Sequence, residues 1–173
     1  MNINIFFVFV VSGLMMIFVL FKPLNIKTQN YTDVPLFDVT SFTLFEFNTN
    51  KLTTIMNGSY AVRFKDRYKV KDIDYTDNTR EYLANIKANK GVYKDDVVDL
   101  TGDVLYTRDD GLTFQSETAS YNKNSTIVET KSDYVSFMGK NRVVGTSVKY
   151  NNLTKEMESE NVTVNYQLKE RDL

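Results

Sequence analysis

Five positively charged side chains recur at every second position near the middle of the chain, and their spacing could serve binding. They are Arg63, Lys65, Arg67, Lys69 and Lys71. On one extended strand they would share a face roughly 26 Å long, at ~3.3 Å per residue. Such a face suits an anionic partner, either phosphorylated lipid headgroups or an acidic protein strand. It could equally be a solvated outer face whose charges prevent edge-to-edge pairing. The other face would carry Val62, Phe64, Tyr68 and Val70.

Carboxylates are the second group that could do chemistry. They cluster as Asp95-Asp96, as Asp109-Asp110, and as Asp72, Asp74 and Asp77. The calcium-loop pattern, with its central Gly and terminal Glu, is absent, and adjacent Asp residues in a turn mostly cap backbone amides. The chain has no His and no Cys, which excludes zinc sites, Cys-His nucleophiles and Ser-His-Asp triads within it. It also lacks a Gly-rich phosphate loop.

These absences argue against catalysis. The one enzyme hypothesis left is a membrane-anchored hydrolase that uses the paired carboxylates Asp95, Asp96, Asp109 and Asp110. We therefore expect no catalytic residues, no metal and no cofactor. The net charge of -1, with 25% charged residues, also argues against nucleic acid as a partner.

Residues 1–22 predict a transmembrane anchor. The run from Ile3 to Phe21 carries no charge and would span about 28 Å as a helix, close to the thickness of a bilayer's hydrocarbon core. A cleaved signal peptide is the main alternative and a buried core helix a third, but no small-x-small cleavage site follows Leu20. The leader contains no Lys or Arg, so charge does not determine the orientation.

Residues 23–36 form a polar connector, and residues 37–173 form the main domain. The latter alternates apolar and polar side chains nearly throughout and is rich in Val, Ile, Thr, Tyr and Phe. Even Thr79 to Lys90, the one possible helix, alternates like a strand. Turn signals separate the runs, at Asn57-Gly58, Lys90-Gly91, Asp109 to Gly111, Asn122 to Asn124, Gly139 to Asn141 and Asn151-Asn152. The prediction is one all-β domain of about 10–12 short antiparallel strands.

A repeat runs through this domain. Three small-residue runs end in a tyrosine, at Tyr93, Tyr121 and Tyr150, and each leads into a second alternating run. A fixed period of this kind indicates a two-strand meander stacked several times. Stacked meanders can close into a barrel, pack as a sandwich or form a jellyroll. The apolar side chains expected to point inward are core by default, and become a ligand site only if the sheet walls stand apart. They include Ile86, Leu100, Val104, Phe114, Val144 and Val148.

The order of features resembles the LptC family of lipopolysaccharide export proteins. The similarity rests on the N-terminal span, the connector and the repeats, among them the segments Leu100 to Tyr106, Leu112 to Tyr121 and Val143 to Tyr150. It implies an open β-jellyroll in the periplasm, anchored in the inner membrane by a single span. Such a protein would take lipopolysaccharide from an ABC transporter and pass it to the next jellyroll of a bridge, without catalysis.

The resemblance also implies where partners bind. Strands near Phe37 to Phe47, with Phe42 and Leu44, would pair with the transporter's jellyroll. The last strand, Val162 to Leu168, with Val162, Val164 and Tyr166, would offer its edge to the bridge protein. Acyl chains would lie against the apolar residues above. The competing hypothesis is a membrane-tethered scaffold that docks partners by its strand edges without binding lipid.

Overall fold

The computed structural model describes residues 3–20, 33–49, 51–79 and 81–167. The chain divides into two compact units, Met1–Tyr31 and Thr32–Leu173. Most of the predicted connector, residues 23–32, and the end of the predicted last strand at Leu168 lie outside the described residues.

The first unit contains a single helix, α1 (Ile3–Leu20), with no acidic residue in its first turn and no basic residue in its last. Its residues are apolar apart from Asn4 and Ser12. Within the described part of the chain, it is the one helix long and apolar enough to cross a membrane.

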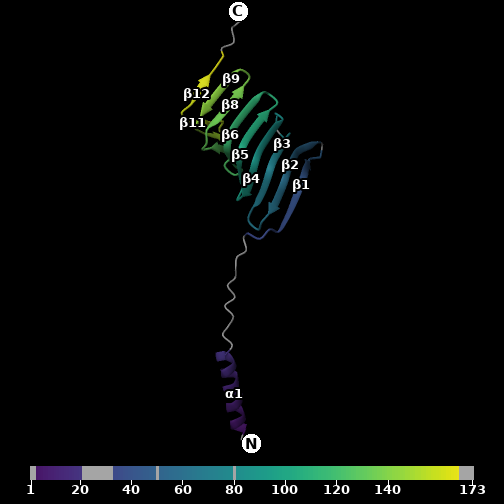
Figure 1. Ribbon diagram of the computed structural model, residues 1–173, viewed down its shortest axis with the longest axis vertical. Coiled ribbons are helices and arrows are strands. Elements are labelled where there is room, and N and C mark those ends of the chain that lie inside the picture. Colours follow the sequence, from purple (N-terminus) through teal and green to yellow (C-terminus); the bar gives the residue numbers. More distant parts are fainter. Residues whose placement is uncertain (1–2, 21–32, 50, 80, 168–173) are drawn as a thin grey trace, which may run out of the picture. The chain divides into compact units, whose positions relative to one another are not determined.

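The second unit is all-β, as predicted, and its described residues form twelve antiparallel strands in one sheet (Figure 1). The strands are β1 (Phe37–Phe47), β2 (Leu52–Arg63), β3 (Tyr68–Asp77), β4 (Ala84–Lys94), β5 (Val97–Arg108), β6 (Leu112–Asn122), β7 (Ile127–Thr130), β8 (Tyr134–Met138), β9 (Asn141–Gly145), β10 (Ser147–Asn151), β11 (Met157–Glu160) and β12 (Thr163–Asn165). The first six contain 10 to 12 residues each and are longer than the short strands predicted.

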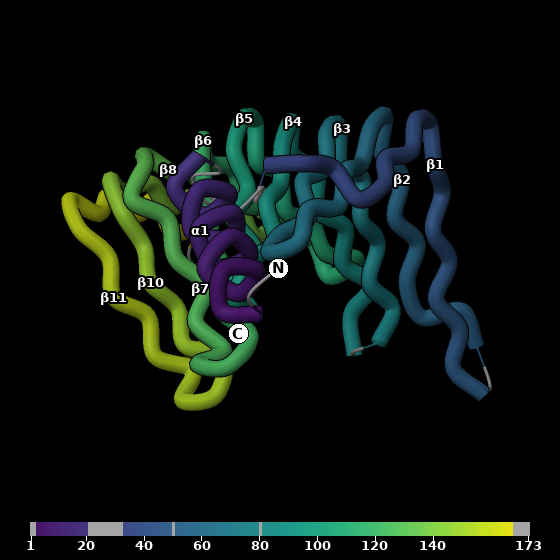
Figure 2. Tube along the Cα trace, turned by 90° about the horizontal axis from the view of Figure 1, so that it is seen from below, coloured from purple at the N-terminus to yellow at the C-terminus, as the bar shows by residue number. Residues whose placement is uncertain are grey.

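The sheet forks at β6. Strands β1 to β6 follow one another as a simple meander (Figure 2). The first half of β6, from Leu112 to Ser116, then pairs with β8, and its second half, from Ser120 to Asn122, pairs with β7. One branch continues through β10 to β11, and the other continues through β9 to β12.

The sheet does not close on itself. Strand β1 has one described neighbour, β2, and the two branches end at β11 and β12. The barrel among the predicted alternatives is thereby excluded, and the open arrangement leaves strand edges at both ends.

Two turn predictions were wrong. Gly58 lies inside β2 and Gly91 inside β4, so neither ends a strand. Both glycines are explained by close packing instead. A Cβ on Gly58 would come within 2.6 Å of the Phe42 ring, and one on Gly91 within 2.5 Å of Ile73 Cδ1. The segment predicted as a strand from Thr79 becomes β-structure at Ala84.

Candidate functional site

One face of the sheet carries long apolar rows that run across the strands. Directly opposed residues in antiparallel strands share a face, so the pairing register identifies each row. Near the end where β2 turns into β3, the paired residues are Tyr68, Tyr93, Val98, Tyr121, Val128, Tyr150 and Met157. The three tyrosines that mark the sequence repeat therefore lie in a single row.

A second long row crosses the other half of the same strands. Its members are Leu44, Met56, Tyr75, Ile86, Tyr106, Phe114, Ser136, Val143 and Val164. Phe114 stacks on Tyr134 of β8, with ring centroids 5.4 Å apart. We call the face that holds both rows the inner face.

A line of polar residues and one glycine separates the two halves and reverses the strand alternation. It runs through Ser41, Ser59, Asp72, Asn89, Gly102, Asp103 and Glu117. Ser41, Asp72 and Asp103 have positive φ angles of 49°, 51° and 49°. Inner-face residues on the two sides of this line are consequently three or four positions apart, as with Ile73 and Val70. We call this line the bend.

Contacts at Gly91 show that both sides of the bend contribute to one face. A Cβ built on Gly91 would meet Ile73, from beyond the bend, and Leu100, which is paired with Gly91 across from β4. The hydrophobic residues of the inner face are most buried along the bend, at Ile73, Ala88, Val104 and Tyr134. Away from the bend, Ile86, Leu100, Phe114 and Val148 remain only partly buried.

The inner face is therefore not a sealed core. Among the described residues, no large side chain is less than 2% exposed. A hydrophobic face that stays partly exposed over this many strands is typical of a ligand-binding surface rather than of ordinary packing. The arrangement can hold an extended apolar molecule lying across the strands.

Five of the six residues predicted to point inward do lie on this face. Leu100 and Val148 are on one side of the bend, Ile86 and Phe114 are on the other, and Val104 lies beside the bend, 3% exposed. The prediction that Val144 shares the face is wrong. Gly145, whose Cβ would meet the Tyr134 ring at 2.7 Å, and Val143 occupy the inner positions of β9, so Val144 points the other way.

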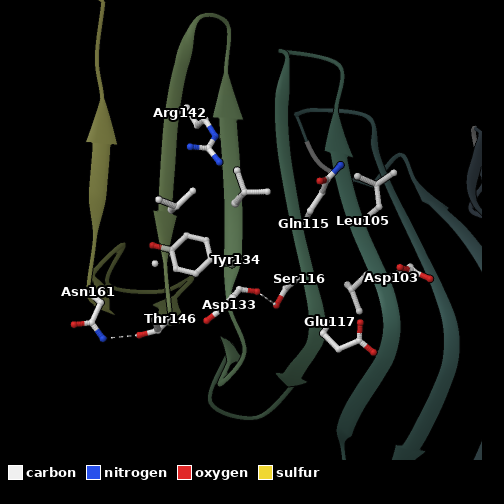
Figure 3. Close-up of a pocket in the computed structure, with 14 residues that line it drawn as sticks. Asp103, Leu105, Gln115, Ser116, Glu117, Asp133, Tyr134, Arg142, Thr146 and Asn161 are labelled. Carbon is white, nitrogen blue, oxygen red and sulfur yellow. Dashed lines mark hydrogen bonds between the residues drawn. The ribbon is translucent and has the colours of Figure 1, made fainter.

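Val144 instead lines a groove of about 780 Å³ on the opposite face. Leu105, Gln115 and Val135 are paired with it across β5, β6 and β8. Figure 3 shows Arg142 beyond this row and the carboxylates Asp103, Glu117 and Asp133 toward the bend. At the bend, Ser116 Oγ donates to the Asp133 carbonyl at 2.9 Å, and Asn161 Nδ2 donates to Thr146 Oγ1 at 3.0 Å.

The residues predicted to bind partners lie at the ends of the sheet. Phe42 and Leu44 are inner-face residues of β1, and Leu44 is half-exposed. At the other end, Val164 lies in β12, while Val162 and Tyr166 flank this short strand. All three are exposed.

The five cations do not share one strand face, contrary to the prediction. The chain turns between Phe64 and Arg67, so Lys65 and Arg67 lie in a hairpin turn. Arg63 is opposite Tyr68, whereas Lys69 is opposite the buried Val62. Lys69 and Lys71 consequently lie on the face opposite to Arg63, and Val62 and Val70 do not share a face.

An ion-pair cluster holds the turn of this hairpin. Arg67 pairs with Asp33 and with Asp66, its Nη1 lying 2.7 Å from Asp66 Oδ1, and it lies over the Phe64 ring. Lys94 Nζ lies 3.3 Å from Asp66 Oδ2. Partial desolvation of Asp66 opposes ionisation, but the hydrogen bond from Lys94 and the charge of Arg67 outweigh it and lower the pKa of that carboxyl.

The bend is the feature that the sequence reasoning missed. The sequence does contain a signal for the bend. Successive inner-face residues are two positions apart along most of the chain, but three positions separate Val70 from Ile73 and Gly145 from Val148. An interpretation based on strict alternation does not detect this change in spacing.

The comparison with protein families agrees with this geometry. The family model described as "LptC: Lipopolysaccharide-assembly, LptC-related" matches residues 7–167, nearly the whole chain. No curated protein sequence matches it.

Proposed function

The chain belongs to the LptC-related lipopolysaccharide-assembly family, and from that premise we propose that it is a non-catalytic carrier. Membership gives it a role in lipopolysaccharide transport. In the proposed step, it receives lipopolysaccharide from an inner-membrane ABC transporter and passes it to the next jellyroll of a periplasmic bridge. Helix α1 fits a single-pass anchor, and the β domain would then lie in the periplasm.

The observation that supports this proposal is the partly exposed apolar inner face. We propose that acyl chains lie along Ile86, Leu100, Phe114 and Val148, with Val143 taking the place expected for Val144. Val104 would form the floor, because it is almost fully buried. Phosphates and sugars would remain in water.

Incomplete enclosure suits a molecule that must be passed on. Burial of each CH₂ group contributes about 0.8 kcal/mol, so several fully enclosed acyl chains would dissociate very slowly. An open face contacts the chains on one side only. The free-energy change for transfer to a similar face would then be close to zero.

Strand edges would make the partner contacts. We propose that β1, with Phe42 and Leu44, pairs with the transporter's jellyroll. Strand β12, with Val164 and its neighbours Val162 and Tyr166, would pair with the bridge protein. An edge strand offers unpaired backbone donors and acceptors to another strand, which is β-augmentation.

Adjacent residues of β9 provide the sharpest test of lipid binding. A photo-crosslinking side chain placed at Val143 faces inward, and one at Val144 faces outward, on the same strand and at similar burial. In intact membranes we expect lipopolysaccharide adducts at Val143 and few at Val144. Ile86 and Leu105 form a second inner and outer pair. Equal yields at the inner and outer positions would contradict the carrier.

The same experiment separates the carrier from a scaffold. Crosslinkers at Leu44 and Val164 should give adducts with two different proteins. If these protein adducts form while every inner-face position fails to capture lipopolysaccharide, then the scaffold function is correct. The free edges are the observation that favours it.

A further inference from the structure

A basic and apolar corner forms where the chain enters the β domain. We define the basic corner as residues 33–37 together with the β2–β3 hairpin, residues 63–69. The Leu36 amide donates to the Arg63 carbonyl at 2.8 Å, and Arg67 pairs with Asp33. Asp33 and Leu36 are thus held against the hairpin.

Three cations of this corner have no ion-pair partner among the described residues. Arg67 is neutralised by Asp33 and Asp66, and Asp66 also takes Lys94. The remaining cations are exposed, and they are Arg63, Lys65 and Lys69. Two of them lie near aromatic rings, Arg63 at 5.3 Å from the Tyr68 centroid and Lys69 at 5.3 Å from that of Phe64.

The nearby carboxylates Asp38 and Asp96 contact tyrosine hydroxyls rather than these cations. Asp38, on the first strand, interacts with Tyr60. Asp96, in the β4–β5 turn, accepts from Tyr93 Oη at 2.8 Å. Neither carboxylate forms an ion pair with Arg63, Lys65 or Lys69 in the described part of the chain, so these cations remain available to an anionic partner.

Exposed apolar side chains lie among these charges. Val34, Leu36, Phe37 and Tyr68 are 50%, 61%, 51% and 40% exposed. Cations on flexible stems, beside exposed apolar and aromatic groups, are the mixture that binds the interface of an anionic bilayer. A purely solvated surface would not need the apolar members.

We propose that the basic corner docks on anionic phospholipid headgroups of the bilayer that α1 spans. Residues 21–32 separate α1 from Asp33, and even a fully extended chain of that length reaches at most about 45 Å. The corner is therefore confined near a membrane surface at high effective concentration, so weak contacts suffice. The cations bind lipid phosphates, and the apolar side chains enter the headgroup region.

The test uses the full chain in lipid nanodiscs without lipopolysaccharide. Because the chain has no cysteine, Ser125→Cys carries a single fluorophore in the β6–β7 turn, at the same end as the corner. Asn78→Cys places the same fluorophore in the β3–β4 turn at the opposite end. A headgroup spin-labelled lipid quenches whichever fluorophore is near the bilayer. Phosphatidylcholine discs are compared with discs containing phosphatidylglycerol.

We expect stronger quenching at Ser125→Cys in the anionic discs, with little change at Asn78→Cys. The triple variant Arg63→Gln, Lys65→Gln and Lys69→Gln should lose this additional quenching. Each charge removed should lower the docking equilibrium constant about fivefold. The control combines Lys131→Gln, Lys140→Gln and Lys149→Gln, which are exposed and outside the corner, and should retain quenching.

Equal quenching in the two kinds of disc, or quenching that survives in the corner variant, would overturn the proposal. Loss in both triple variants would also overturn it, because it would reveal a response to net charge alone. Thermal unfolding of each variant checks folding. The readout contains no lipopolysaccharide, so its failure would leave the carrier function untouched.

Discussion

The two parts of the sheet make the same bend in different ways. In β1 to β5 each strand runs through the bend unbroken, and residues such as Asp72 and Asp103 take positive φ there. In the part after β6, one strand ends at the bend and a new strand begins beyond it. The two members of each pair therefore lie on opposite sides of the bend, and the pairs are β7 and β8, β9 and β10, and β11 and β12. Thr146 and Asn161 sit at two of these breaks.

The side chains at the bend differ accordingly. The N-terminal part uses exposed pairs such as Asn89 Nδ2 to Asp103 Oδ2, 2.9 Å. The C-terminal part uses a buried network, in which Thr130 Oγ1 lies 3.0 Å from Ser116 Oγ and 3.2 Å from Thr118 Oγ1. Where the strands are continuous, backbone hydrogen bonds on both sides of the bend hold it in place. Where the strands are interrupted, side-chain hydrogen bonds must connect the two sides.

Removing the buried hydroxyl of Thr130 should therefore have the largest effect. Thr130→Val keeps the shape but leaves Ser116 Oγ, Thr118 Oγ1 and the Ser132 amide without this partner. We expect a loss of about 3 kcal/mol in the free energy of unfolding, measured by urea denaturation. Asn89→Ala, which cuts an exposed pair at the same level of the sheet, should cost less than about 0.5 kcal/mol. Similar losses would show that the two bends are held alike.

Glycines next to the bend give a second comparison. A Cβ on Gly145 would come within 2.9 Å of the Glu160 carbonyl oxygen, which cannot move without breaking the branch. On Gly58 the two closest atoms belong to the Phe42 ring, at the free edge of β1, which can rotate away, and the nearest backbone atom is the Lys71 carbonyl oxygen at 3.2 Å. We expect Gly145→Ala to cost about 2 kcal/mol and Gly58→Ala less than about 1 kcal/mol in the same assay. The reverse order would mean that the edge is the more rigid part.

The strands and their antiparallel arrangement could be predicted from the sequence because alternation and turn chemistry are local. The turns at Gly111 and Gly139 were predicted because glycine adopts positive φ freely, and both glycines do have positive φ. The family resemblance was likewise confirmed, since the repeats are regular. The single row that contains Tyr93, Tyr121 and Tyr150 follows from the same period.

The bend could not be found by these rules because only one of its residues, Gly102, is a glycine. Asp72 and Asp103 look like ordinary outward-facing residues of a strand, although each shifts the alternation that follows. The same shift at Thr146 put Val144 on the wrong face. The β2–β3 turn was missed because Phe64 to Arg67 contains no Gly, Pro or Asn. Packing of Phe42 on Gly58 is a contact between strands, which local patterns do not encode.

Positive φ angles give a third contrast, with smaller effects. Thr126, in the C-terminal part, has φ of 57° although it is β-branched, and its buried hydroxyl has no hydrogen-bond partner among the described residues. Thr126→Gly should raise stability by about 1 kcal/mol, because glycine adopts this conformation freely. Asp72→Gly relieves the same strain but loses the hydrogen bond to Ser59. The midpoint of thermal unfolding of Asp72→Gly should hardly change. A clear increase in that midpoint would show that the hydrogen bond from Ser59 does not stabilise the fold.

Acid should act on the β5–β6 turn and not on its C-terminal counterpart at Gly139 and Lys140, which has no carboxylate. Arg108 donates to both oxygens of Asp110, and this hydrogen bonding lowers the pKa of the carboxyl below its usual value near 3.9. A carboxyl whose pKa is lower in the folded chain stabilises the fold above its unfolded pKa, and the contribution disappears as pH falls through the folded value. The stability gap between the unaltered protein and Asp110→Asn should thus be constant above about pH 5 and close below about pH 4. Asp109→Asn keeps the Arg108 pair, so its denaturation curves should follow those of the unaltered protein across this range. A gap for Asp110→Asn that persists in acid would mean that the amide disturbs the turn itself rather than removing a charge.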